Sequence, residues 1–349
     1  MNPRPKPART CAPRSTLRNF IVSAAALIVC AVPGCTQPPQ TAANGEPLRL
    51  ATYFWPGSFW IDVAWKKGWF AEAGVDVERV DVEGDFFKSL DRVAEGHLDA
   101  VAFTHFDLVR LAAAGHNLVG VVAVDYSDGA EALISRPRIA KVGDLKGKRV
   151  GLRRGTYLEY LFITIAEREG LDIADVVLVE MPTDESAAQL ASGRVDAVMA
   201  WEPYASQAQQ AIQGVKLFST ADFPGLAYST LGLRKEFIDA RPRDVEALVR
   251  VWRRATEYVR KHPAEVCALT AGLNQYPVAD CYAIMRVDRI LDVADNDRAF
   301  SYAAGFDSMH GSWRRMNDYM IDQGLVHKRV SSTDHLDSRF IRALDQVAP

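Results

Sequence analysis

Residues 89–103 read SLDRVAEGHLDAVAF, and residues 186–200 read SAAQLASGRVDAVMA, so that the two stretches align without a gap. The copies share, among others, Gly96 with Gly193 and Asp99 with Asp196. Each copy predicts a helix that ends at a glycine, which takes the left-handed conformation without strain, and then a buried strand. We interpret the pair as equivalent parts of two similar α/β lobes that arose by duplication, although a chance match within one domain is the alternative.

The sequence on both sides of the repeat alternates short apolar runs with helical patterns. The apolar runs predict strands near residues 48–53, 75–82, 98–103, 118–124, 149–152, 175–181, 195–201 and 226–233. Helices are predicted between them, near residues 58–72, 85–95, 105–114, 156–169, 184–192 and 202–213. Repeated strand–helix units call for parallel sheets covered by helices, so the predicted fold class is α/β. From Lys235 onward the pattern becomes helical.

The composition is that of a globular protein with an acidic body. A chain of 349 residues corresponds to roughly two domains. A hydrophobic content of 48% with 24% charged residues excludes a disordered chain, and a mean hydropathy of -0.08 excludes a protein built of membrane spans. The net charge of -3 includes basic residues within positions 1–34, where no acid occurs, so the remainder is more acidic still. We therefore expect no nucleic-acid partner, because phosphate binding depends on Lys and Arg.

The first 34 residues have the pattern of a signal peptide. Basic residues precede the uncharged run 20–32 (FIVSAAALIVCAV), which would span about 20 Å as a helix against about 30 Å of bilayer hydrocarbon. The sequence VPGC at 32–35 resembles the lipobox of bacterial lipoproteins, although Pro33 departs from the usual small residue. We expect residues 1–34 to be removed, Cys35 to be acylated and residues 35–46 to form a flexible tether. An uncleaved anchor or an ordinary secreted start is the alternative.

The five cysteines have different expected fates. Cys11 and Cys30 leave with the signal peptide, and Cys35 carries the lipid. Cys267 and Cys281 remain, either as a disulfide that joins two helices or as two buried thiols. The histidines and cysteines lack metal-ligand spacing, and no glycine-rich nucleotide fingerprint or hydrolase motif occurs, so we expect neither a metal nor a cofactor.

The candidate ligand-binding residues lie at the carboxyl ends of the predicted strands. Two parallel sheets that face each other bind ligands best in the crevice at those ends. The candidates from the first lobe are Trp55, Pro56, Thr104, His105, Asp125, Ser127 and Glu131, and those from the second are Thr156, Tyr157, Trp201 and Glu202.

Several of these candidates also have a purely structural interpretation. Trp55 and Trp201 form flat walls for a planar ligand or fill the edge of the core. Glu202 accepts a ligand N–H group or complements a helix start. A lone histidine such as His105 is more often a packing residue than a ligand. Asp125 contacts the ligand or shapes a turn.

The charges near the strand ends indicate the chemistry of the ligand. Acids outnumber bases there, and an unpaired buried charge is costly, so the cleft should select a ligand rich in N–H donors or positive charge. Thr156 begins a helix whose N–H groups could hold an anion, but Glu159 places a carboxylate in the same turn. We therefore expect a small planar nitrogen compound, such as an aminopyrimidine, a guanidinium or a urea-like solute.

From Leu48 to about Ala343 the chain resembles the solute-binding proteins of ABC transporters, in the group that takes nitrate, sulfonates, taurine and thiamine pyrimidines. The resemblance rests on the order of six motifs: WPG at 55–57, WKKGWFAEAGVDVE at 65–78, GHLDAVAF at 96–103, DYSDGAE at 125–131, DLKGKRVG at 144–151 and GRVDAVMAWEPY at 193–204. The tail at 320–325 and 334–340 is also similar to the family's.

The resemblance implies a two-lobe periplasmic binding protein fold of type II, with a mainly parallel sheet in each lobe. Lobe 1 would comprise residues 47–138 and 226–349, and lobe 2 residues 139–225, with hinge closure over the solute. It further implies a monomeric, extracytoplasmic, lipid-anchored protein that is not an enzyme and delivers its solute to a membrane permease. The alternatives are a nitrate, sulfonate or taurine binder, a solute sensor for a membrane receptor and, least favoured, an enzyme of the pyrimidine-synthesising kind.

Overall fold

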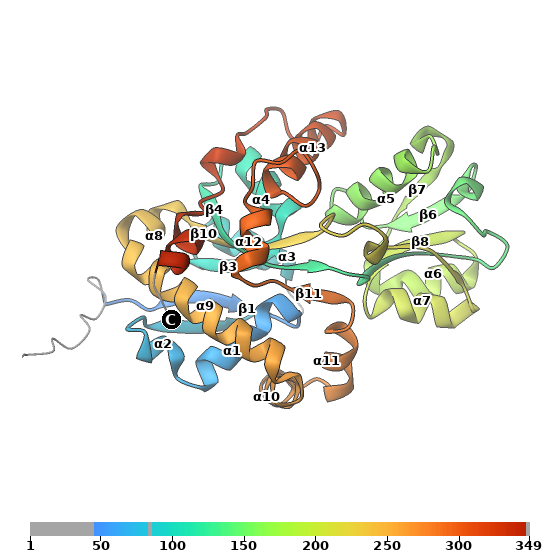
Figure 1. Cartoon of the computed structure of the whole chain (residues 1–349). Coiled ribbons are helices and arrows are strands. Elements are labelled where there is room, and N and C mark those ends of the chain that lie inside the picture. Colours follow the sequence, from blue (N-terminus) through green and yellow to red (C-terminus); the bar gives the residue numbers. More distant parts are fainter. Residues whose placement is uncertain (1–44, 83–85, 347–349) are drawn as a thin grey trace, which may run out of the picture. The chain divides into compact units, whose positions relative to one another are not determined.

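The computed structural model in Figure 1 describes residues 45–82 and 86–346. Contacts divide the chain into Met1–Pro38 and Pro39–Pro349, and all described residues belong to the second unit. The predicted signal peptide, the acylation site Cys35 and nearly all of the tether lie outside the described residues. Among the helices that are described, none is long and apolar enough to cross a membrane.

Six strands form the first sheet, in the order β11-β4-β10-β3-β1-β2. Their bounds are β1 Leu48–Thr52, β2 Val77–Asp81, β3 Ala100–Thr104, β4 Leu118–Ser127, β10 Tyr228–Arg234 and β11 Asp288–Ile290. β1 runs parallel to β2 and β3, whereas β10 runs antiparallel to β3 and β4. The sheet is therefore mixed, with its parallel part at the amino-terminal strands.

Five strands form the second sheet, in the order β7-β6-β8-β5-β9. Their bounds are β5 Glu131–Ser135, β6 Arg149–Leu152, β7 Val177–Glu180, β8 Ala197–Trp201 and β9 Val215–Ser219. The parallel set β7-β6-β8 matches β2-β1-β3, and antiparallel β5 stands beside β8 as β10 stands beside β3. The α/β class and the two-sheet architecture are confirmed, although both sheets are mixed.

The strand prediction missed β5, β9 and β11. β5 follows β4 after a turn of only three residues, and its five residues had not been assigned to any element. Because β5 pairs with β8 and β9, the chain enters the second sheet at Glu131, before the expected lobe boundary at 138. β11 has only three residues, Asp288–Ile290, which is too short to show an alternating pattern.

Fourteen α-helices are found in the described part of the chain. Those of the amino-terminal two thirds are α1 Phe59–Lys66, α2 Trp69–Glu72, α3 Phe86–Ala94, α4 His105–Ala113, α5 Tyr157–Arg168, α6 Ser186–Ser192 and α7 Tyr204–Ile212. The rest are α8 Lys235–Ala240, α9 Pro242–Lys261, α10 Pro263–Asn274, α11 Val278–Ile284, α12 Val293–Ala299, α13 Met309–Asp322 and α14 Arg339–Arg342. The helix expected over 58–72 is divided at Gly68, whose φ of 73° ends α1.

Short 3₁₀ helices connect several elements. They are η1 Pro56–Ser58, η2 Val142–Leu145, η3 Ile173–Asp175, η4 Thr183–Glu185, η5 Thr220–Asp222, η6 Ser332–Asp334 and η7 Ala343–Gln346. η1 connects β1 to α1 and follows Trp55 directly.

Strand periodicity distributes the apolar side chains of the second sheet between two helical layers. Ala132 and Ile134 of β5 pack in a small cluster with residues of α6 and α7, whereas Leu133 joins the larger core that contains residues of α5. Figure 1 shows the same arrangement, with α5 on one side of β6 and β8 and with α6 and α7 on the other.

The two copies of the repeat anchor their neighbouring strands through the same hydrogen bonds. In the first copy, the backbone N and Nε of Arg49 donate to Asp99 Oδ2 at 3.0 and 2.9 Å, and Nη2 donates to Gly96 O at 2.8 Å. In the second, the same three atoms of Arg149 donate to Asp196 Oδ2 at 2.9 and 3.0 Å and to Gly193 O at 2.8 Å. This identity supports the duplication.

Cys267 of α10 and Cys281 of α11 are joined as a disulfide. Of the two alternatives that the sequence left open, the structure therefore has the cross-link between two helices and not a pair of free thiols.

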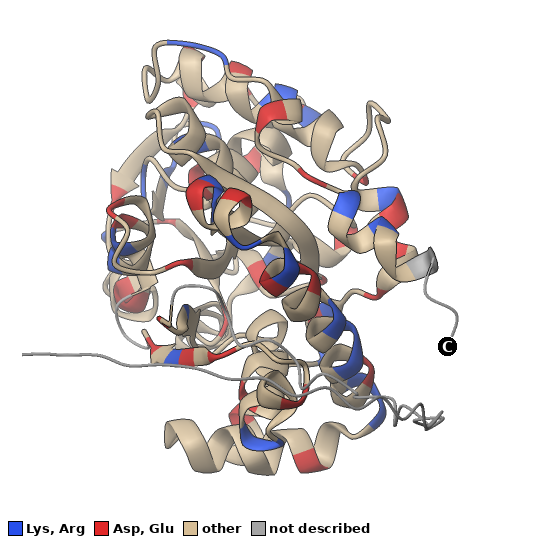
Figure 2. Cartoon of the chain, turned by 90° about the vertical axis from the view of Figure 1, so that its left-hand side faces the viewer, with Lys and Arg blue, Asp and Glu red and all other residues tan. Residues whose placement is uncertain are grey.

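The surface carries charges of both signs. Basic and acidic residues are interspersed on the helices in the view of Figure 2. Many form exposed pairs, such as Arg254 with Glu72 at 2.6 Å and Lys235 with Asp239 at 2.7 Å. Such pairs contribute little to stability.

Candidate functional site

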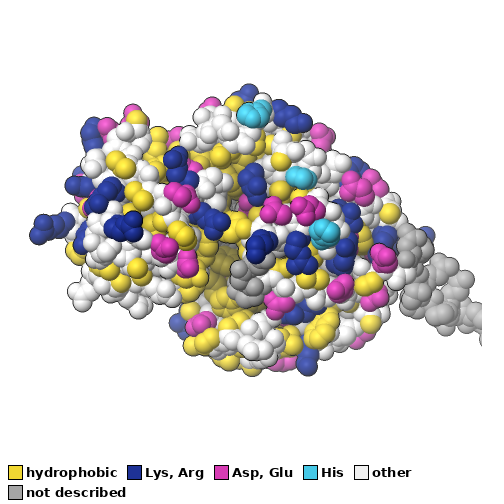
Figure 3. Space-filling view, turned by 180° about the vertical axis from the view of Figure 1, so that it is seen from behind, with side chains coloured by type: hydrophobic (Ala, Val, Ile, Leu, Met, Phe, Trp, Pro, Cys, Tyr) yellow, Lys and Arg dark blue, Asp and Glu magenta, His cyan; other side chains and the backbone are white. Residues whose placement is uncertain are grey.

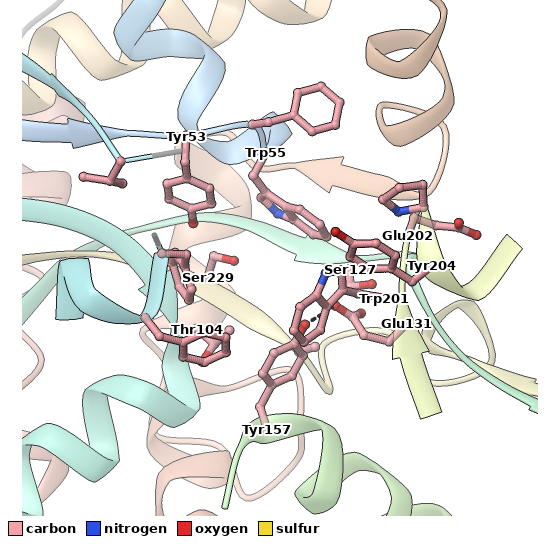
Figure 4. A pocket seen from close by; sticks show the side chains of 16 residues that line it. Tyr53, Trp55, Thr104, Ser127, Glu131, Tyr157, Trp201, Glu202, Tyr204 and Ser229 are labelled. Atoms are coloured by element: carbon pink, nitrogen blue, oxygen red, sulfur yellow. Dashed lines mark hydrogen bonds between the residues drawn. The ribbon is translucent and has the colours of Figure 1, made fainter. Parts of the chain in front are cut away.

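A cavity of about 200 Å³ lies between the two sheets. Its walls from the side of the first sheet are Tyr53, Phe54, Trp55, Val82, Phe86, Phe87, Thr104, Ser127, Ala227 and Ser229. Its walls from the side of the second sheet are Glu131, Tyr157, Trp201, Glu202, Pro203 and Tyr204. Figure 4 shows these side chains around the cavity, and Figure 3 shows hydrophobic side chains at the bottom of a hollow on one face.

Most of the residues proposed from the strand ends line this cavity. They are Trp55, Thr104, Ser127, Glu131, Tyr157, Trp201 and Glu202. Six of them follow or end β1, β3, β4, β6 and β8, whose carboxyl ends face the same gap, as expected for parallel strands in sheets that oppose each other. Glu131 is the exception, because it begins β5, which runs antiparallel to β8.

Four of the proposed residues do not line the cavity. Pro56 is buried in η1. Thr156 caps α5, because its hydroxyl accepts from Leu158 N and donates to Arg153 O. Asp125 is buried beneath η1, where its Oδ2 lies 1.8 Å from the position that a Cβ on Gly57 would occupy. The sequence gives each residue a place along the chain, but not the direction of its side chain.

His105, the fourth, is a packing histidine. It is buried at the start of α4, and its Nε2–H donates to the carbonyl oxygen of Met309, 2.9 Å away on α13. Burial lowers the pKa of His105 to about 4, because the apolar surroundings disfavour the imidazolium.

The pKa of His105 predicts a specific acid sensitivity. Since the imidazole titrates near 6.5 when unfolded and near 4 when folded, its contribution is complete above pH 6.5 and is lost as the pH falls through 4. We expect the free energy of unfolding to fall by about 3 kcal/mol from this group between pH 7 and pH 4. His105→Gln should remove that loss in urea titrations, whereas the exposed His97→Gln should not. An unchanged pH slope in the first variant would contradict the prediction.

Trp201 is the centre of the aromatic lining. As the last residue of β8, it lies nearly parallel to Tyr157, with ring centroids 6.1 Å apart and an interplanar angle of 16°. The ring of Phe87, which comes from α3 beside the first sheet, lies 6.3 Å from that of Trp201, and the ring of Tyr204 lies 6.4 Å from it. Aromatic rings from both halves therefore enclose the space in front of Trp201.

The cavity contains two carboxylates in different situations. Glu131 is buried, and it accepts from the Tyr157 hydroxyl at 2.9 Å, while its burial raises the pKa of its carboxyl group. Glu202 accepts from the backbone N and the hydroxyl of Ser206 at 3.2 and 2.8 Å, in the first turn of α7. Glu202 thus has the helix-stabilising role considered above and also borders the cavity.

No lysine or arginine is among the described residues that line the cavity. Arg153 does not line the cavity, but its guanidinium lies 4.2 Å from the centre of the Phe87 ring, which does. No group of three or more His, Cys, Asp or Glu in the described part of the chain is placed to hold a metal ion. The lining can therefore stack on a flat ligand and accept hydrogen bonds from it.

Sequence reasoning missed several lining residues. They are Tyr53, Phe54, Val82, Phe86, Phe87, Pro203, Tyr204, Ala227 and Ser229. The run YFW at 53–55 was a usable signal, because alternate residues at a strand end point to opposite sides and all three aromatic side chains could not be buried in one core. Phe86 and Phe87 begin α3, and nothing in the local pattern indicates that this helix start borders the cleft.

Comparison with known proteins identifies a family for the chain and several relatives. A model of the family described as NMT1/THI5 like matches residues 55–266. A protein of Bacillus subtilis (strain 168), named as an aliphatic sulfonates-binding protein, is 23% identical over 290 residues, which cover 80% of this chain and 83% of the relative. A Brucella abortus (strain 2308) relative, named only as a binding protein, is 25% identical over 240 residues, covering 67% of this chain and 73% of its own.

Solved structures establish the fold. The periplasmic aliphatic sulphonate binding protein SsuA from Escherichia coli superposes with a TM-score of 0.68 at 19% identity, covering 83% of this chain and 97% of that one. The desulfurization enzyme DSZB has a TM-score of 0.60 at 17% identity, with 86% and 99% covered. The two-lobe periplasmic binding protein fold is thus confirmed, and it is shared by binding proteins and by an enzyme.

Proposed function

The chain belongs to the NMT1/THI5-like family, and we propose that it is the extracytoplasmic solute-binding component of an ABC importer. The observation that carries this proposal is the aromatic cavity between the two sheets, which both halves of the fold line. A ligand that touches both halves favours the closed arrangement, which is how a hinged binding protein captures a solute. The relatives named as binding proteins support the same role.

The lining favours a small planar nitrogen-containing solute. Tyr157, Trp201 and Trp55 offer flat faces to a planar ring or guanidinium group. Glu131 and Glu202 can accept from N–H groups. An anion in this cavity would find no cationic side chain among the described lining residues, and a buried unpaired charge costs several kcal/mol.

A sulfonate is the second candidate ligand. The Bacillus subtilis relative is named as an aliphatic sulfonates-binding protein, and the SsuA structure shares the fold. A sulfonate would have to rely on backbone N–H groups and on Arg153, whose guanidinium lies over the Phe87 ring and does not line the cavity. We rank it below a planar amine for this reason.

We propose binding without chemical turnover. Catalysis of the covalent or acid–base kind needs a nucleophile and a base in mutual reach. Within the described chain the cavity lining includes neither a cysteine nor a histidine, and His105 is engaged with Met309. DSZB shows that the fold also supports an enzyme, so turnover belongs in the test.

A ligand screen by thermal unfolding tests the proposal. We expect guanidinium compounds, aminopyrimidines or urea-like solutes to raise the melting temperature, since a ligand at 100 times its Kd adds about 2.7 kcal/mol to the free energy of unfolding. Taurine, alkanesulfonates and nitrate should have little effect at the same concentrations. If only the anions stabilised the protein, the ligand would be assigned as a sulfonate or a related anion. If NMR showed that a bound compound is consumed, the proposed binding role would be overturned.

A further inference from the structure

Two carboxyl groups lie side by side beneath the wall of the cavity. In the antiparallel pairing of β4 with β11, Asp125 is opposite Ile290 and Asp288 is opposite Ser127. Residues two apart along a strand point to the same face, so the side chains of Asp125 and Asp288 are diagonal neighbours on one face of the sheet. Neither residue lines the cavity.

Both carboxyl groups are buried without a full set of partners. All four of their oxygens are buried, and none accepts a hydrogen bond of normal geometry from any described residue. Neither forms an ion pair with any Lys, Arg or His of the described chain. Two buried negative charges without a counter-charge would cost several kcal/mol, so the pair retains protons to a higher pH than exposed acids do.

Asp125 fits against the turn that presents Trp55. Its Oδ2 lies 1.8 Å from the position that a Cβ on Gly57 would occupy, so only glycine fits there without a shift. Gly57 is the central residue of η1, and Trp55 is the residue that precedes this turn. The Trp55 indole N–H is itself buried without a hydrogen bond of normal geometry in the described structure. The position of the Trp55 wall therefore depends on how closely η1 packs on the two carboxyl groups.

The groups that face the pair make its charged form costly. Burial is the main cause that raises the pKa of Asp125, to about 7, and that of Asp288, well above its usual range. The charge of Asp125 further raises the pKa of Asp288, and the charge of Glu131 raises the pKa of both groups. Asp128 also raises the pKa of Asp288. The opposing donors are neutral: Ser229, Trp55 and the amide of Gly57 lower the pKa of Asp125. Two such acids titrate as a unit.

We propose that Asp125 and Asp288 form a proton-sharing pair that positions Trp55 in the wall of the cavity, and that ionisation of this pair loosens the wall. Ionisation of the pair would draw water toward the carboxylates and separate η1 from the sheet, because the described structure supplies no cation there. The inference does not depend on which solute the cavity holds.

The pH dependence of stability tests the shared proton. A carboxyl whose pKa is higher folded than unfolded stabilises the fold fully below about pH 4, and this contribution is lost as the pH rises through about 7. Between pH 5 and pH 8 the unfolding equilibrium constant of the unsubstituted protein should therefore rise on the order of a hundredfold more than that of Asp125→Asn. Asp184→Asn, at an exposed acid of η4 that does not act on either carboxyl group, should keep the full pH dependence.

Trp55 supplies the second readout. The emission of Trp55, obtained as the difference between the protein and its Trp55→Phe variant, should shift to longer wavelength between pH 5 and pH 8 and should stay constant in Asp125→Asn. Asp288→Asn is the second variant if the first does not fold. The proposal would be overturned if the stability of the protein and that of a folded Asn variant depended on pH in the same way. It would also be overturned if the emission of Trp55 in the unsubstituted protein did not change with pH. A merely structural role would lower stability equally at every pH.

Discussion

Trp201→Ala is expected to abolish the thermal shift that a bound solute produces, while the melting temperature of the unliganded protein changes little. Trp201 is partly exposed at the end of β8, and its ring is flanked by Tyr157 at 6.1 Å and Phe87 at 6.3 Å. Alanine removes the stacking surface at the centre of the cavity, where a desolvated aromatic residue contributes most to binding. The affinity should fall by on the order of a hundredfold or more.

Calorimetric titration of Trp201→Ala with a solute that stabilises the unsubstituted protein measures this loss. Trp65→Ala is the matched control, because the Trp65 side chain on α1 is 46% exposed and does not line the cavity. The control should bind with unchanged affinity. Trp201 would be a packing residue if Trp201→Ala still bound the solute. The same conclusion would follow if the variant lost its unliganded stability together with its affinity for the solute.

Asp99→Ala is expected to remove about 3 kcal/mol from the free energy of unfolding. The Asp99 side chain is only 5% exposed, and its carboxylate accepts from Arg49 and also from Arg234 Nη2 at 2.5 Å. Although burial acts in the opposite direction, the hydrogen bonds from both guanidinium groups lower the pKa of Asp99. Alanine would leave Arg49 and Arg234 without their acceptor. Removal of one partner of a buried ion pair costs about 3–5 kcal/mol, and we expect the lower value because the Arg49 side chain is 33% exposed.

The duplication supplies the control for this prediction. Asp196 accepts the same bonds from Arg149, but its side chain is 22% exposed and that of Arg149 44% exposed. Solvent screening reduces the value of such a pair, so Asp196→Ala should destabilise the protein clearly less than Asp99→Ala does. Urea denaturation of both variants gives the comparison. Equal losses would show that the shared hydrogen-bond pattern, and not burial, sets the energy.

The strand-end rule was a useful but incomplete guide to the cavity. It led to Trp55 and Trp201, because parallel strands direct their carboxyl ends toward one gap. Glu131 lines the same cavity for another reason, since it begins antiparallel β5 directly opposite Trp201. It failed at His105 and Asp125, because the side chains of neighbouring residues at one strand end point in different directions. Thr104 borders the cavity, whereas the next residue, His105, turns into the packing against α13.

The sequence by itself determined the α/β class, the duplicated helix–strand unit and the order of most elements. These features depend on runs of consecutive residues: hydrophobic periodicity, and glycines such as Gly96 and Gly193, which end helices. Tertiary structure alone decided that β5 joins the second sheet, which ring of the first half meets Trp201, and that Asp125 lies beside Asp288. Such neighbours follow from strand register and from the packing of distant elements, which no local pattern encodes.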